Sequence, residues 1–421
     1  MLVVLVLLYL FMIFIRPHEY IVVLQNISIP MYLLLLSSVV WWFSTDRQKM
    51  DRIPQTRAIF IFLFFILISN VFGGWGSKGV TEAAKFLPVV LLFLIIISGF
   101  NSEEKIHKAI KLIVFCAVII SIHGFFQKQD GIGWTGVELY QSRIRYVGIF
   151  NDPNDLGVLL VMAVPMVLYC FSAVKSKLIK LYYLSSLLII IVGIYLTNSR
   201  GSILSLIAMG MFYIKERYGK KYIIYMSVLL SPLLLLAPSR MSQVSASEES
   251  AAGRIYAWYQ GLQMLFSNPV SGIGTGRFTD YHIITAHNSF ILIIAEMGIF
   301  GYWMWMLMFV LSFFMVSSIR KKSYINHNIT FNADRLKSQT MMFYYGFIGM
   351  FTSIFFLSRS YLVLLYVFVA LALANYTFID TKLLDVKERY SIANIWMKYL
   401  GYSIASVIGF YIVVKVLLMF V

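Results

Sequence analysis

Charged residues are scarce in this chain: they make up 13% of its 421 residues, whereas hydrophobic residues make up 60%. The mean hydropathy is +0.80. The sequence also lacks any long polar segment that could fold as a separate soluble domain. These absences exclude a soluble globular protein, and the composition is typical of a polytopic membrane protein.

Cysteine is nearly absent as well. The two cysteines, Cys116 and Cys170, fall inside apolar stretches, so we expect neither a metal site nor a disulfide from them. The N-terminal stretch 1–15 is apolar but lacks a basic region and an Ala-x-Ala cleavage site. We therefore interpret it as a retained helix and not as a cleaved signal peptide.

Long apolar runs fill most of the remaining sequence. A membrane-spanning helix needs about 20 residues, and several of the runs are shorter than that. Together they predict an all-α polytopic membrane helix bundle with 12–13 transmembrane helices. The runs lie near residues 1–15, 21–43, 57–72, 84–100, 108–127, 156–173, 179–197, 202–214, 221–238, 288–318, 339–357, 361–379 and 395–419.

Acidic residues are outnumbered, with 19 Asp and Glu against 35 Lys and Arg. The basic residues concentrate in alternate loops, for example in 47–57, 175–180 and 215–221. By the positive-inside rule these loops are cytoplasmic, and so is the N-terminus. The basic excess therefore reflects membrane topology, and no nucleic acid partner is expected.

The longest outer segment separates the ninth and tenth apolar runs. We expect an N-terminal transmembrane bundle over 1–238, an outer loop over 239–287 and C-terminal transmembrane helices over 288–421. Within the loop, apolar residues recur at helical spacing from Arg254 to Phe266. That pattern predicts an amphipathic helix on the outer membrane–water boundary.

Arginine outnumbers lysine in the outer segments, which suits a phosphate-bearing ligand because the guanidinium group binds phosphate bidentately. Arg200 precedes the short run 202–214, so we expect it at or below the outer boundary, facing a wet cavity. Arg254 starts the amphipathic helix, where free N–H groups favour anions. The alternative for both is a charge that meets only lipid headgroups or water.

The stretch 285–301 has a histidine at the mouth of an apolar run and a carboxylate inside it. Asn288 and Ser289 are suitable N-caps, which leaves His287 at the water boundary, where a histidine can exchange protons near neutral pH. Glu296 follows nine residues later, half a turn out of phase, so we expect it to bond a neighbouring helix instead. The alternative for His287 is a residue that only anchors the helix.

Two other stretches suggest functions that their context disfavours. Residues 151–155, Asn-Asp-Pro-Asn-Asp, offer oxygen ligands for Mg²⁺, but a turn and a helix start explain them better. The glycine-rich stretch 272–276 follows no strand, so we interpret it as a turn leading to His287 and not as a nucleotide site. We expect no metal and no cofactor.

Four motifs follow one another in the chain. They are Ser199-Arg200-Gly201, Arg254-x-x-x-Trp258, Pro269-x-x-Gly272-x-Gly274, and His287-Asn288 with Glu296-x-Gly298-x-x-Gly301. This ordered set resembles the O-antigen ligase and polymerase superfamily over about residues 146–301. Members of that superfamily are membrane glycosyltransferases that act on undecaprenyl-linked glycans.

The resemblance implies an O-antigen ligase of lipopolysaccharide biosynthesis. Such an enzyme transfers a glycan from undecaprenyl diphosphate to a lipid A-core sugar hydroxyl, with inversion and without a metal, on the periplasmic face of the bacterial inner membrane. The resemblance also implies that His287 acts on the acceptor hydroxyl. Arg200 and Arg254 would bind the diphosphate, and Arg145 is a weaker third candidate.

Three alternatives stay open. A surface-polysaccharide polymerase and a protein O-glycosylating ligase differ from the first reading only in the acceptor. A transporter or flippase of a lipid-linked sugar belongs to another class, and it would place charges along a path across the bilayer and show inverted repeats. The candidate residues lie at one membrane level instead, which favours chemistry.

Overall fold

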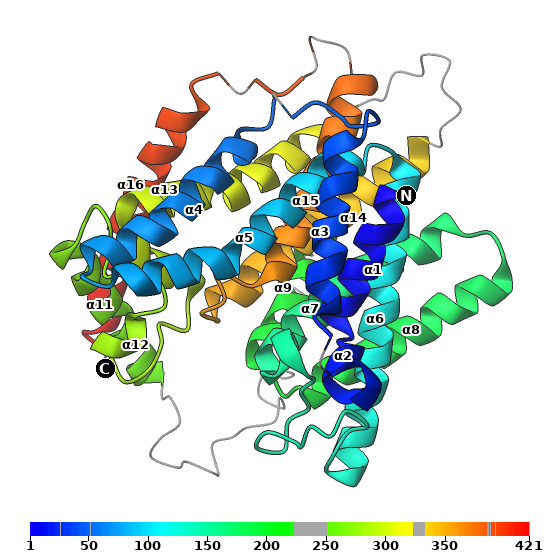
Figure 1. The fold of residues 1–421 in the computed structure, drawn as a ribbon, viewed down its shortest axis with the longest axis horizontal. Helices are drawn as coiled ribbons and strands as arrows, with labels where there is room; N and C mark the ends of the chain where they lie inside the picture. The colour runs from blue at the N-terminus through cyan, green and yellow to red at the C-terminus, as the bar shows by residue number, and fades with distance from the viewer. Residues whose placement is uncertain are drawn as a thin grey trace. The chain divides into compact units, whose positions relative to one another are not determined.

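The protein is described by a computed structural model that covers all residues except 26, 51, 220, 223–250, 323–332, 385, 386, 388, 392 and 421. Helices form the described part, with two isolated β-bridges and no sheet (Figure 1). This confirms the predicted all-α fold.

Eight described helices are long and apolar enough to cross a membrane. They are α4 (Pro54–Phe72), α5 (Gly76–Gly99), α6 (Glu103–Asp130), α7 (Pro153–Ala173), α8 (Lys177–Leu196), α13 (Ser289–Ile319), α15 (Val363–Lys382) and α16 (Ile395–Leu417). Two shorter apolar helices are α1 (Leu2–Phe14) and α3 (Ile29–Phe43). The protein is thus a multi-pass membrane protein, while the count of 12–13 spans stays a prediction because most of the run 221–238 lies outside the described residues.

The remaining helices connect or flank these spans. They are α2 (Pro17–Tyr20), η1 (Val22–Leu24), η2 (Gly148–Phe150), α9 (Arg200–Tyr218), α11 (Ala251–Ser267), α12 (Phe278–Tyr281) and α14 (Ala333–Phe355). Helix α9 has 19 residues, so the short helix predicted over 202–214 was wrong. The helix continues through Lys215, Glu216 and Arg217 because these residues are good helix formers. A helix of this length gives no reason for Arg200 to lie below the membrane boundary.

The chain divides into two compact units. The first unit comprises Met1–Val40, Glu104–Glu248 and Phe331–Ser353; the second comprises Trp41–Glu103, Glu249–Thr330 and Ile354–Val421. The sequence predicted a different division, into membrane-spanning parts over 1–238 and 288–421 and an outer loop over 239–287. That division stays a prediction.

In the first unit, α7 packs against α8 and α9. A Cβ atom added to Gly157 of α7 would collide with the Ser202 side chain of α9. The absence of a side chain at Gly157 therefore allows the two helices to approach closely, as small residues do in membrane helix pairs.

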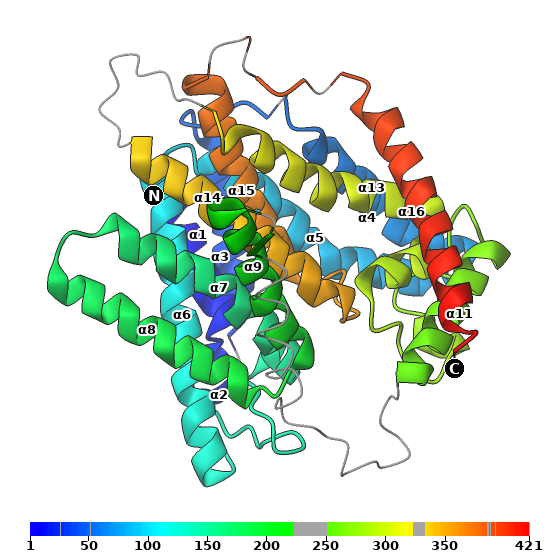
Figure 2. The same ribbon diagram turned by 180° about the vertical axis from the view of Figure 1, so that it is seen from behind.

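In the second unit, α13 is the central helix and packs against α4, α11, α15 and α16 (Figures 1 and 2). The helix predicted from Arg254 to Phe266 is α11, whereas its place on the outer membrane–water boundary stays a prediction. Its apolar residues Trp258 and Leu262 are buried in one cluster with Ile291 and Leu292 of α13. At Trp258 and Leu262 the apolar face of α11 thus packs against protein.

Helix α13 is interrupted at Gly298, whose φ of 64° and ψ of −167° are not helical. Because of the interruption, nearby backbone carbonyls of α13 accept hydrogen bonds from the loop that precedes the helix. Ala295 O accepts from the Ile273 amide at 3.0 Å, and Glu296 O accepts from the Gly274 amide at 3.0 Å. The broken helix and the loop are therefore joined by backbone hydrogen bonds.

We expect Gly298→Ala to destabilise the protein. A side chain is strained at this φ and ψ by about 1–3 kcal/mol, and the new Cβ would lie 2.5 Å from Val270 O. The matched control is Gly409→Ala in α16, where a Cβ meets nothing within 4 Å. That change should be neutral or stabilising by about 0.5–1 kcal/mol. Thermal unfolding in detergent measures both, and equal shifts would contradict the interpretation.

Candidate functional site

His287 lies directly before Asn288, the N-cap residue of α13. Its φ of 47° is left-handed, which is uncommon for a residue with a side chain. The next residue, Asn288, caps the helix: its side-chain oxygen accepts from the Phe290 amide at 2.9 Å and the Ile291 amide at 3.2 Å. The helix start predicted at Asn288 and Ser289 is confirmed, and His287 lies half-buried at it.

Arg254 is held in the same region through Trp258. The indole Nε1 of Trp258 donates to Ala286 O at 2.8 Å, directly before His287. Arg254 lies four residues before Trp258, so both occupy one face of α11. The Arg-x-x-x-Trp motif thus links the first turn of α11, with its half-buried arginine, to the segment that carries the histidine.

A distant segment is joined to the start of α13 by Ser289. Its hydroxyl donates to Leu357 O at 2.6 Å and accepts from the Arg359 amide at 3.0 Å, while the Ser360 hydroxyl donates to Ser289 O at 2.9 Å. The half-buried Arg359 is therefore anchored two residues from His287. No local sequence pattern could have found this pairing, because 70 residues separate Ser289 from Arg359.

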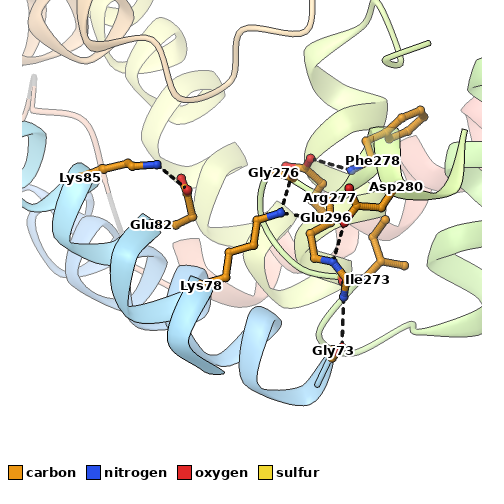
Figure 3. A network of polar contacts seen from close by, with 10 residues as sticks. All are labelled: Gly73, Lys78, Glu82, Lys85, Ile273, Gly276, Arg277, Phe278, Asp280 and Glu296. Carbon is orange, nitrogen blue, oxygen red and sulfur yellow. Dashed lines mark hydrogen bonds and ion pairs between the residues drawn. The ribbon is translucent and has the colours of Figure 1, made fainter. Parts of the chain in front are cut away.

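The side chain of Glu296 holds the glycine-rich loop (Figure 3). Its carboxylate accepts from the backbone amides of Gly276, Arg277 and Phe278, the last at 3.3 Å, and from the Tyr361 hydroxyl at 2.9 Å. Glu296 makes structural contacts, as expected. Its donors lie in the turn before the short helix α12, at Phe278, the first residue of α12, and at Tyr361 between α14 and α15. Burial and, next, the Glu296 charge raise the pKa of Tyr361, which keeps this hydroxyl protonated.

The glycine-rich stretch forms the predicted turn. Gly272, Gly274 and Gly276 all have positive φ values. The Thr275 side chain between the last two hydrogen-bonds to Tyr361 and lies 3.2 Å from the Ser69 hydroxyl of α4. Hydrogen-bonding contacts of Thr275 with Tyr361 and Ser69 thus hold the turn in place.

Arg277 is engaged in structural contacts. Its Nη1 donates to Gly73 O at 3.0 Å and Ile273 O at 3.3 Å, and its Nε donates to Asp280 at 3.0 Å (Figure 3). Its guanidinium also stacks on Trp75, 4.7 Å from the ring centre. This buried side chain fastens the loop to the turn between α4 and α5.

In the first unit, Arg143 holds the turn that leads to Arg200. Its Nε donates to Thr197 O at 2.8 Å and its Nη2 donates to the Asn154 side chain at 2.6 Å, and the residue is buried. Arg200 is the first residue of α9; it is exposed, and its side chain forms no hydrogen bond or ion pair with any described residue. The buried arginine positions the turn, while the exposed one is left for solvent or a ligand.

Arg145 is partly engaged. Its Nε donates to Glu138 O at 2.9 Å, and its guanidinium lies 5.6 Å from the Tyr140 ring centre. It shares the first unit with Arg200, and the adjacent Ile144 amide donates to Leu196 O, near the turn, at 3.3 Å. The sequence-predicted residues are thus divided between the two units: His287 and Arg254 belong to the second unit, and Arg145 and Arg200 to the first.

The segment 151–155 forms the predicted helix start. Asp152 caps α7 by accepting from the Asn154 amide at 2.7 Å, and Pro153 is the first helical residue. Asp155 lies in the first turn and is buried. Over the described part of the chain, no three His, Cys, Asp or Glu side chains are grouped so that they could hold a metal ion.

The architecture is that of a multi-pass, all-helical membrane protein with a histidine and arginines at helix starts. Residues 185–306 match the family model Wzy_C, described as O-Antigen ligase, and no curated protein matches the chain. The chain therefore carries a domain of the O-antigen ligase family, which includes ligases and polymerases. Members transfer glycans, and the family implies lipid-linked glycan substrates. The match includes Arg200, Arg254 and His287 but not Arg145.

The two arginines of the first unit should differ in their effect on stability. Arg143→Met leaves Thr197 O and the Asn154 side chain without their donor, and a lost buried partner costs about 1–3 kcal/mol. Arg200→Met changes an exposed residue and should stay within about 0.5 kcal/mol of the wild type. Thermal unfolding of the purified variants measures the difference. A loss at Arg200 as large as that at Arg143 would make Arg200 a structural residue.

Proposed function

We propose that this protein is an O-antigen ligase, which transfers a glycan from undecaprenyl diphosphate to a lipid A-core sugar hydroxyl at the periplasmic face of the bacterial inner membrane. The observation that carries the proposal is the hydrogen bond from Trp258 to Ala286, which holds the Arg254 helix beside His287 within the family domain. A base and a phosphate-binding cation are the two groups that this reaction needs.

In the proposed reaction, the acceptor oxygen attacks the anomeric carbon of the donor sugar. His287 takes the proton of the acceptor hydroxyl as general base. The bond from the anomeric carbon to the diphosphate oxygen breaks, the configuration inverts and undecaprenyl diphosphate leaves. Arg200 and Arg254 bind the diphosphate and stabilise its developing charge, with Arg145 as a weaker third group. The arginines supply the positive charge, so the mechanism uses no metal or cofactor.

The acceptor defines the experiment that tests the proposal. Purified protein would receive lipid-linked donor with a lipid A-core acceptor, a second lipid-linked repeat or an acceptor protein, each in the presence of EDTA. Transfer to lipid A-core supports the ligase. Transfer only between lipid-linked repeats would make the protein a polymerase, and transfer only to protein would make it a protein ligase.

His287→Ala should lose transfer while donor binding and membrane abundance persist. Removing a general base lowers the rate by about 10²–10⁴-fold. The matched control is His282→Ala in the same segment, because the His282 ring contacts Ile284 O of its own turn at 2.9 Å. That variant should keep most of the activity. Near-normal transfer by His287→Ala would show that His287 only anchors the helix.

Arg200→Lys and Arg254→Lys should each impair transfer, because lysine keeps the charge but loses the bidentate fork. A charge-assisted hydrogen bond is worth about 1.5–3 kcal/mol, or roughly 10- to 150-fold. Both residues would act on one diphosphate, so the double variant should depart from additivity. Inhibition by free undecaprenyl diphosphate should weaken in parallel.

The control for these variants is Arg57→Lys at the start of α4, an exposed position outside the family match. It should transfer glycan like the wild type. Wild-type behaviour of both Arg200→Lys and Arg254→Lys would remove these residues from the proposed phosphate site.

A further inference from the structure

Three stretches of the second unit meet at Glu296. The carboxylate binds the amides of residues 276–278 and the hydroxyl of Tyr361, as described above. The backbone carbonyl of the same residue accepts from the Gly274 amide at 3.0 Å. Glu296 therefore holds the loop at two points, and it is only 2% exposed.

A carboxylate suits these contacts for a chemical reason. Consecutive backbone amides in a bend form a concave site for an anion. An ionised carboxylate has two acceptor oxygens with about four lone-pair sites, whereas a glutamine amide of the same size has one acceptor oxygen with two. Burying such a charge is costly unless it is hydrogen-bonded in this way. A Cβ atom at Gly272 would collide with the Glu296 backbone, so the loop reaches the helix only because glycine stands there.

The two segments that Glu296 contacts, residues 276–278 and the segment around Tyr361, both extend to the surroundings of His287. In the first segment, the ring of Phe278 packs in the cluster that contains Trp258 and Ala286, and Ala286 directly precedes His287. In the second segment, Tyr361 lies two residues after Arg359, whose amide donates a hydrogen bond to the Ser289 hydroxyl. One buried carboxylate thus sets the segments on two sides of the histidine.

We propose that Glu296 is a positioning residue for glycan transfer, which orients the His287 and Arg359 segments without contacting the substrate. This inference rests on the proposed function. A role in stability alone would lower the amount of folded protein and leave the turnover of each folded molecule unchanged. A positioning role lowers kcat in folded protein.

Glu296→Gln tests the distinction, because glutamine keeps the size but replaces one acceptor oxygen by an NH₂ donor. In folded protein we expect kcat to fall by roughly 10- to 150-fold, the range of one lost charge-assisted bond. The KM for the donor and the inhibition by undecaprenyl diphosphate should stay near wild type. Tyr361→Phe removes one donor and should give a smaller loss of kcat.

Glu82→Gln is the matched control, since among the described residues Glu82 pairs only with Lys85 on α5, at 2.8 Å (Figure 3). It should leave kcat unchanged. A loss of kcat in Glu82→Gln equal to that in Glu296→Gln would overturn the inference.

A second readout does not depend on activity. Both native cysteines are buried, so spin labels can be placed at Ile283→Cys, where the side chain is 97% exposed, and at Val80→Cys, 61% exposed. We expect a narrow distance distribution by electron spin resonance, which broadens when Glu296→Gln is added and not when Glu82→Gln is added.

The outcomes separate the two proposals. Broadening together with a lower kcat supports the positioning role. An unchanged distribution, or broadening with unchanged kcat, overturns that role and leaves the ligase proposal standing. Failure of the wild type to transfer glycan to any acceptor overturns the proposed function, even where the distance measurement shows that Glu296 holds the loop.

Discussion

A backbone amide or carbonyl inside a membrane has no water to bind, so each must find a partner within the protein. The interruption of α13 at Gly298 makes this requirement acute, because it removes helical partners inside a candidate span. The loop that follows α11 supplies the replacements at Ala295 and Glu296. This exchange of hydrogen bonds holds the loop against α13, and the same loop leads on to His287.

The arginines of this protein serve two different purposes. Arg143 and Arg277 are buried and donate to backbone carbonyls, so their charge stabilises turns. Arg200 is exposed at a helix start, where the free amides also favour an anion. Burial and hydrogen bonding thus distinguish the roles of arginines that the sequence alone does not distinguish. The same environment determines whether a guanidinium holds the chain or is available to a phosphate.

Much of the fold followed from local patterns. The apolar runs predicted helices, Asn288 and Asp152 marked helix starts, and the glycines of 272–276 marked a turn. These predictions succeeded because hydrophobicity, capping and backbone freedom act over a few residues. The length of α9 was mispredicted because hydropathy does not report that lysine, glutamate and arginine also continue a helix.

The sequence by itself determined that this is an all-helical membrane protein and that a histidine stands at the start of a membrane helix. It also contained the ordered motifs of the O-antigen ligase family. Only the tertiary structure decided which residues serve Glu296 and what joins Arg359 to Ser289, because these contacts bridge 65 and 70 residues. Such pairings form because buried polar groups need hydrogen-bond partners. The partners can be far apart in the sequence, so no periodic sequence pattern reveals them.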